Sequence, residues 1–209
     1  MQKTAMLLLH DNLGSGNAYK VRLMLSHLET PFKRIEYVVT LGETRTADFM
    51  ALSPDGRVPL LEFPDGRLLP QSNAILFFLS QGTDYLPTGA FAQAQVLQWM
   101  FFEQYSHEPN IAVARHWLHY LDPEDLDREQ LAEKQRKGYH ALDVMEGRLA
   151  GSDFLVGAGY SIADMALYAY THVADEAEME LDNYPGIRCW LDRVADQPGH
   201  VLITQEDFS

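Results

Sequence analysis

The chain has 209 residues, of which 46% are hydrophobic and 11% aromatic, a composition typical of one large or two small globular domains. It carries 30 acidic and 16 basic residues, a net charge of −14, and no basic cluster of the kind that binds nucleic acid. One cysteine excludes an intramolecular disulfide, and no segment reaches the length of a membrane span or a secretory signal core, so we expect a cytoplasmic protein without membrane partners.

The first eighty residues alternate between strand and helix patterns. Strands are predicted over 5–10, 34–39, 60–63 and 67–69, and helices over 18–28, 47–52 and from 72 onward. The segment 64–67, Pro-Asp-Gly-Arg, predicts a tight turn between the last two strands. This order matches a thioredoxin-like α/β domain over residues 1–81.

The second part of the chain carries the whole acidic excess and only helical patterns. After a linker at 86–89, these patterns cover 90–121, 126–149, 162–177 and 184–195, so residues 88–209 are expected to form an all-helical domain. Ser161 and Asp164 have the spacing of a capping box at a helix start. Cys189 is expected to pack in a helix interface. His116 and His119 share a helical face without a third ligand, so no metal site is predicted.

Two short motifs stand out in the first domain. Val58-Pro59 precedes a strand, and because proline has no N–H, Val58 must direct its peptide groups at something other than an ordinary ladder partner. Gln71-Ser72 opens an apolar run with helical spacing, so Ser72 is predicted to be a helix N-cap. The N–H groups of a helix start attract a carboxylate, and Gln71 adds amide donors.

Together these motifs resemble the glutathione site of the glutathione transferase family. The resemblance implies a cis Val58-Pro59 bond, with Val58 binding the cysteinyl backbone of glutathione and with Gln71 and Ser72 binding its γ-glutamyl carboxylate. It also implies the family fold, an α/β thioredoxin-like N-terminal domain followed by an all-α C-terminal domain that lines the pocket of a second, electrophilic substrate. Glutathione would be a co-substrate, and no metal would be required.

The same resemblance places the residue that activates the thiol in the loop after the first strand. The run from Ser15 to Arg22 is similar to the serine-type zeta and theta classes, and the chain has no tyrosine before Tyr19 and no cysteine other than Cys189. Ser15 is therefore expected to donate a hydrogen bond to the glutathione sulfur, with Asn17 as a second candidate donor. Members of the zeta class carry a Ser-Cys pair after the first serine, whereas this chain has Gly-Asn, which disfavours isomerase chemistry of the zeta kind.

Other ligands of glutathione are expected outside these motifs. Arg45 or Arg57 would bind the glycine carboxylate of glutathione. In the family, the first long helix of the second domain contributes to the second-substrate pocket and to the dimer interface. On that helix, Phe102 and Tyr105 are candidates to line the apolar pocket. Glu103 or Gln104 is a candidate to bind the amino group of glutathione.

These observations predict a homodimeric transferase that conjugates the glutathione thiolate to a small apolar electrophile, in a detoxifying role. Two alternatives stay open. The chain could be a noncatalytic protein of the transferase fold that binds partners or apolar ligands, or it could use glutathione for peroxide reduction or dehalogenation. Thiol–disulfide exchange by a protein sulfur is disfavoured because the loop holding Ser15 has no cysteine.

Overall fold

The computed structural model describes residues 6–208, which divide into two compact units. Unit 1 contains residues up to 81 together with the C-terminal segment from 198, and unit 2 contains residues 82–197. None of the helices in the described part of the chain is long and apolar enough to cross a membrane.

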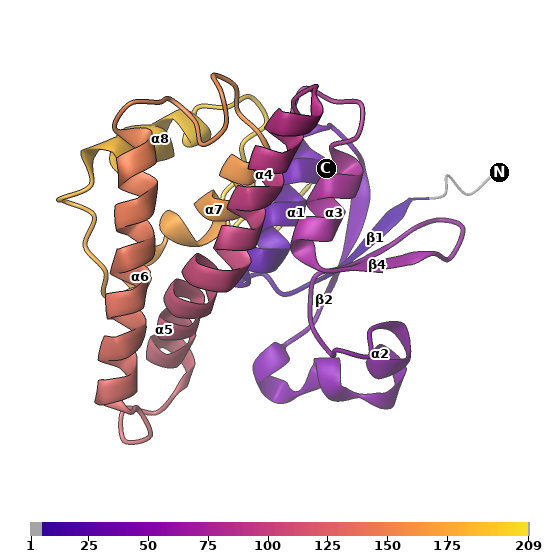
Figure 1. Ribbon diagram of the computed structural model, residues 1–209. Coiled ribbons are helices and arrows are strands. Elements are labelled where there is room, and N and C mark those ends of the chain that lie inside the picture. The colour runs from indigo at the N-terminus through magenta and orange to yellow at the C-terminus, as the bar shows by residue number, and fades with distance from the viewer. Residues whose placement is uncertain (1–5, 209) are drawn as a thin grey trace. The chain divides into compact units, whose positions relative to one another are not determined.

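Unit 1 is built on a four-stranded sheet with the strand order β2-β1-β3-β4 (Figure 1). The strands are β1 (Leu7–Asp11), β2 (Phe32–Glu36), β3 (Leu60–Glu62) and β4 (Leu68–Pro70). β1 and β2 are parallel and need a crossover, which is α1 (Gly16–His27), whereas β3 pairs antiparallel with both β1 and β4. The mixed sheet confirms the predicted thioredoxin-like domain.

One face of this sheet is covered by α1 and by α3 (Ser72–Leu79), which also contact each other. The core under them consists of six buried apolar side chains, which are Leu9, Val21, Leu25, Phe32, Leu61 and Ile75. The opposite face meets the short helix α2 (Ala47–Leu52) through Phe49, whose ring lies edge-on to those of His10 and Tyr37. Because successive strand residues point to opposite faces, Leu9 lies in the core under α1 and α3, and His10 lies on the face that contacts α2.

The second strand and its continuation differ from the prediction. The pattern predicted a strand over 34–39, but β2 begins at Phe32 and ends at Glu36, and Val39–Leu41 forms a 3-10 turn. Phe32 enters the core and pairs with Leu7 of β1, so the parallel register decides where the strand begins.

The C-terminal segment from residue 198 also departs from the prediction, which included it in the helical domain. Its backbone carbonyls accept hydrogen bonds from α1, with Tyr19 Oη donating to Val201 O at 2.7 Å and Arg22 Nη2 donating to Ile203 O at 3.0 Å. The Phe208 ring lies 5.1 Å from that of Phe32. Buried donors need acceptors, and here the tail supplies them.

Unit 2 is helical, as predicted (Figure 1). Its elements are α4 (Ala90–Phe102), a π-turn η3 (Glu103–His107), α5 (Glu108–Tyr120), α6 (Arg128–Leu149), α7 (Ile162–Thr171), the 3-10 turn η4 (Ala174–Ala177) and α8 (Pro185–Ala195). The pattern over 90–121 predicted one helix, and the π-turn interrupts it. The Glu108 N–H bonds to Glu103 O, five residues earlier, as in a π-helix. The next residue, Pro109, has no backbone N–H to donate.

The capping box of α7 is confirmed, and all ten residues of this helix are buried. The Asp164 carboxylate accepts from Ser161 N at 3.0 Å, from Leu155 N at 2.9 Å and from Trp190 Nε1 at 2.9 Å. Burial raises the pKa of Asp164, and these donors oppose the rise. The prediction for Cys189 is wrong, because this residue is exposed on α8.

Candidate functional site

The Val58-Pro59 peptide bond is cis, as the resemblance implied, and it lies immediately before β3. Val58 is half-buried and belongs to no strand. Within residues 6–208, neither its N–H nor its C=O takes part in a backbone hydrogen bond. An unpaired donor and acceptor on one residue can bind the backbone of a peptide ligand in the manner of an added strand.

The start of α3 is strained and partly buried. Gln71 has a φ of 74°, in the left-handed region that non-glycine residues rarely adopt, and such residues cluster at functional sites. Gln71 is the N-cap of α3, and Ser72 is the first helical residue, which corrects the prediction that Ser72 caps the helix. Because Ser72 lies inside the helix, its hydroxyl points to neighbouring side chains instead of capping a backbone N–H.

Ser15 is the N-cap of α1, and its Oγ accepts a hydrogen bond from Ala18 N at 3.3 Å. The loop before it is held by the end of β2, since Asn12 Nδ2 donates to Tyr37 O at 2.9 Å and Leu13 N donates to Glu36 Oε1 at 2.8 Å. The Ser15 hydroxyl donates to none of the described residues, so its proton can be directed at a ligand.

The starts of α1 and α3 meet through side chains. Ser72 Oγ and Asn17 Oδ1 are 3.2 Å apart, and Lys20 Nζ lies 2.8 Å from Asn17 Oδ1 and 3.4 Å from Ser72 Oγ. Lys20 is 0% exposed, and the sequence did not predict it as a site residue. The sequence feature that indicates a role for Lys20 is its place in an apolar helical run, because charged residues are almost never fully buried without partners. The sequence predicted a helix here, and in the structure every residue from Ala18 to Leu25 of this helix is buried.

A second buried cation, Arg22, supports the loop that carries Ser15. Its Nη1 lies 2.7 Å from Asp11 Oδ1, and its Nη2 donates to Leu13 O at 2.8 Å. Arg34 Nε pairs with the other Asp11 oxygen at 2.6 Å. Burial lowers the pKa of the Arg22 guanidinium, and its pairing with Asp11 opposes that change.

Arg45 ends the 3-10 turn Glu43–Arg45 and Arg57 directly precedes Val58, and the side chains of both contact Asp55. Arg45 Nη1 donates to Asp55 O at 2.9 Å, and Arg57 Nε lies 3.6 Å from Asp55 Oδ2. Both side chains remain exposed, so either could reach a carboxylate bound along Val58.

The four residues of unit 2 named from the sequence have different surroundings. Glu103 is buried and accepts from Gln104 Nε2 at 2.8 Å, while Gln104 is exposed. Phe102 is half-buried with its ring 5.4 Å from that of Trp99, whereas Tyr105 is 87% exposed. The π-turn has a longer repeat than an α-helix, so residues three apart no longer align along one face.

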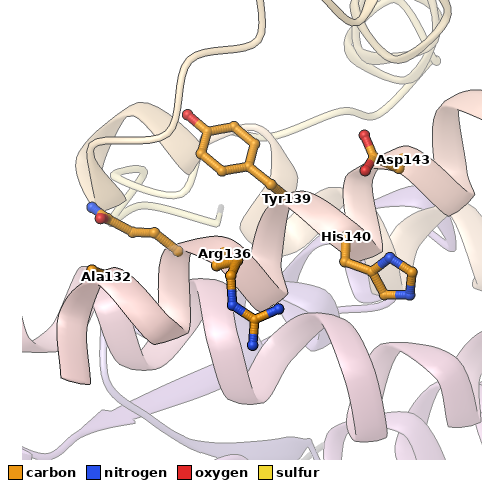
Figure 2. A pocket seen from close by; sticks show the side chains of 6 residues that line it. Ala132, Arg136, Tyr139, His140 and Asp143 are labelled. Carbon is orange, nitrogen blue, oxygen red and sulfur yellow. The ribbon is translucent and has the colours of Figure 1, made fainter. Parts of the chain in front are cut away.

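Unit 2 also has an open hollow on α6 (Figure 2). Its lining residues all belong to this helix and are Ala132, Gln135, Arg136, Tyr139, His140 and Asp143. A small-molecule site buries most of its ligand, which a wall formed by one helix does not do. Within the described part of the chain, no three His, Cys, Asp or Glu side chains are grouped as a metal ion would require.

Comparisons with known proteins agree on one family. Residues 14–81 match the family model described as "Glutathione S-transferase, N-terminal domain", and residues 110–198 match "Glutathione S-transferase, C-terminal domain". A solved glutathione S-transferase from Pseudomonas fluorescens [Pf-5] is 48% identical with a TM-score of 0.92, covering 96% of this chain and 100% of that one.

Two curated relatives carry different descriptions. The glutathione S-transferase-like protein LUC7 of Fusarium sp is 30% identical over 202 residues, which cover 90% of this chain and 88% of the relative. The disulfide-bond oxidoreductase YfcG of Escherichia coli (strain K12) is 28% identical over 192 residues, covering 87% of each. With both family domains matched along the chain and a solved member nearly half identical, this protein belongs to the glutathione S-transferase family.

Proposed function

We propose that this chain is a glutathione transferase that conjugates the thiolate of glutathione to a small apolar electrophile. Val58 binds the cysteinyl backbone, Gln71 and Ser72 bind the γ-glutamyl carboxylate at the start of α3, and Ser15 donates a hydrogen bond to the sulfur. Arg45 or Arg57 binds the glycine carboxylate. The homodimer, the cytoplasmic location and the detoxifying role remain predictions.

The observation that carries this proposal is the contact between the starts of α1 and α3. Ser72 Oγ and Asn17 Oδ1 are 3.2 Å apart, although these residues are 55 positions apart in the chain. This contact brings the loop of Ser15 next to the start of α3, so one tripeptide could reach both. The unpaired Val58 peptide supports a ligand with a peptide backbone.

The proposed chemistry needs a raised fraction of thiolate. A free thiol has a pKa of about 8.5, and a hydrogen bond donated to the sulfur stabilises only the charged form. Each unit by which the pKa falls corresponds to about 1.4 kcal/mol. The thiolate then attacks carbon, a C–S bond forms, and the leaving group departs with the electron pair of the broken bond.

Replacing Ser15 by alanine tests the role of its hydroxyl. We expect Ser15→Ala to raise the pKa of bound glutathione by about one unit, because the charged sulfur loses a donor. The ultraviolet absorbance of the thiolate, titrated against pH, measures this shift, while calorimetry should find the affinity nearly unchanged. Ser26→Ala is the matched control, since Ser26 donates its hydroxyl to Gly199 O near the other end of α1. An unchanged titration in Ser15→Ala would remove Ser15 from the mechanism.

A second candidate function is the reduction of disulfides, favoured by the similarity to the oxidoreductase YfcG. Glutathione thiolate would attack one sulfur of a disulfide, giving a mixed disulfide with glutathione and releasing the other half as a thiolate. The attacking sulfur would belong to glutathione, because the loop of Ser15 has no cysteine. Turnover of a small disulfide, compared with halides, epoxides, isothiocyanates and hydroperoxides, separates this reaction from conjugation and from peroxidase chemistry.

The noncatalytic alternative is tested by retention on immobilised glutathione. A protein of this fold that serves only as a scaffold should pass through the column, whereas a transferase should be retained. The electrophile would contact unit 2, where Phe102 and Tyr105 remain candidates for its pocket. Glu103 or Gln104 remains a candidate to bind the amino group of glutathione.

A further inference from the structure

We infer that Arg22 is a positioning residue that connects the C-terminal segment to the loop of Ser15. This inference rests on the proposed function, because that loop carries the hydroxyl assigned to the glutathione sulfur. The side chain of Arg22 is 0% exposed, and its Nη2 donates to Leu13 O at 2.8 Å and to Ile203 O at 3.0 Å. One buried nitrogen thus binds two segments from opposite ends of the chain.

The shape of the guanidinium group makes this connection rigid. The group is planar, and the two N–H bonds of Nη2 point in fixed directions, so both carbonyls must lie where that fork can reach them. The neighbouring nitrogen, Nη1, lies 2.7 and 2.8 Å from the two oxygens of Asp11, which is part of β1. Because the sheet holds Arg22 through Asp11, the position of the C-terminal segment constrains the position of Leu13.

A second arginine makes a similar connection through the other peptide group of Leu13. Arg34 Nε lies 2.6 Å from Asp11 Oδ2, and its Nη2 pairs with Glu36. The other Glu36 oxygen accepts a hydrogen bond from Leu13 N at 2.8 Å. Arg34 Nη1 also donates to Glu206 O at 3.4 Å. The interactions therefore close into a ring through Asp11 and Leu13, and both arginines of this ring also donate to the C-terminal segment.

This ring fixes the turn that leads to Ser15. Ser15 N donates to Asn12 O at 2.9 Å, so Leu13 and Gly14 are the central residues of the turn. Since both the N–H and the C=O of Leu13 are bound, the turn has one orientation, and Ser15 follows it directly as the N-cap of α1. A hydrogen bond weakens steeply outside a narrow range of distance and angle, so a displaced Ser15 hydroxyl would stabilise a thiolate less.

Hydrogen exchange in the absence of glutathione tests whether Arg22 holds the loop. Arg22→Lys keeps the charge beside Asp11, but a lysine lacks the planar fork that binds two carbonyls in fixed directions. We expect the amides over 12–18 to exchange about tenfold faster in this variant. Arg67→Lys is the matched control, because Arg67 lies exposed in a surface ion pair and should leave these amides unchanged.

Phe208→Ala tests the contribution of the C-terminal segment. The ring of Phe208 packs against the core of unit 1, 5.1 Å from that of Phe32, so its removal should loosen the segment that carries the two acceptor carbonyls. We expect exchange over 12–18 to become about threefold faster or more. Phe63→Ala is the matched control, since Phe63 is a half-buried phenylalanine that packs against the same core directly after β3.

The pKa of bound glutathione is the second measurement. We expect Arg22→Lys to raise this pKa by about half a unit, less than the unit expected for Ser15→Ala, because the hydroxyl is displaced and not removed. In a Ser15→Ala background, Arg22→Lys should cause no further rise, since the hydroxyl that Arg22 positions is already absent.

Three results would overturn the inference. One is an unchanged exchange rate or an unchanged pKa in folded Arg22→Lys, and another is a further rise of the pKa in the Ser15→Ala background. The third is equal exchange over 12–18 in Phe208→Ala and Phe63→Ala, which also decides the matter if Arg22→Lys does not fold. If Ser15→Ala leaves the titration unchanged, or the unmodified protein gives no heat with glutathione, the proposed function fails instead. The exchange measurements then still decide whether the C-terminal segment holds the loop.

Discussion

Gly56 offers a way to move Arg45 without touching it. Gly56 has a φ of 63°, and a Cβ built there would lie 2.3 Å from Arg45 Nη1 and 2.9 Å from Met50 Sδ. Gly56→Ala must therefore displace the guanidinium group, and with it the hydrogen bond from Arg45 to Asp55 O at 2.9 Å. Because that group is the far end of a flexible side chain, it can move without unfolding the turn.

The expected cost has two parts. An alanine at a left-handed position costs about 1 kcal/mol relative to glycine, and the lost hydrogen bond adds about 1 kcal/mol. Gly66→Ala is the matched control, because Gly66 has a φ of 84° and a Cβ there would meet nothing within 4 Å. We therefore expect a loss of about 2 kcal/mol in Gly56→Ala and about 1 kcal/mol in Gly66→Ala, measured by urea denaturation.

The affinity for glutathione decides the role of Arg45. If Arg45 binds the glycine carboxylate, Gly56→Ala should weaken binding by about fivefold or more, and Arg45→Met should reproduce that loss. Gly66→Ala should bind glutathione as the unmodified protein does. Equal affinities in the two glycine variants would refute the reasoning and leave Arg57 as the cation.

Two further predictions concern buried ionisable groups. Arg22→Met should destabilise the fold by about 3 kcal/mol. This is near the low end for a broken buried ion pair, because Arg34 still pairs with Asp11. Denaturation midpoints measure this loss, and Arg67→Met, which removes an exposed ion pair, should show no comparable loss. Burial lowers the pKa of His172, and the hydrogen bond of this imidazole to a backbone carbonyl opposes the change. The unfolded chain therefore binds a proton at His172 more tightly than the folded chain does, so stability falls as the pH drops below about 6.5. Melting temperatures at about pH 7.5 and 5.5 should differ less in His172→Phe, and an undiminished difference would contradict this.

Much of the site was predictable because its signals are local. Val58-Pro59 limits the hydrogen bonding of its own backbone, and Gln71-Ser72 lies where an apolar helical run begins. Ser161 and Asp164 are three residues apart and cap the same helix turn. In each case the residues that interact are neighbours in the chain, so spacing and side-chain chemistry suffice.

The predictions that were wrong concern features that spacing and side-chain chemistry do not specify. The prediction made Ser72 the N-cap, but a backbone φ of 74° at Gln71 shifts the helix start by one residue, and no local rule specifies that value. The helical pattern over 90–121 did not reveal the π-turn either, although Pro109 beside it is a local signal for an interruption. Cys189 lies between Ile187 and Trp190 in α8, yet it faces outward because these two residues occupy the buried side.

The amino-acid sequence by itself determined the order of strands and helices, the two-module division of charge and the motifs at the starts of α1, β3 and α3. Only the tertiary structure decided that Lys20 joins Asn17 and Ser72, and that the last residues return to α1. Periodicity and capping depend on residues within one or two turns, whereas a buried cation takes its partners from whatever the packing brings within hydrogen-bond distance, here from 52 positions away.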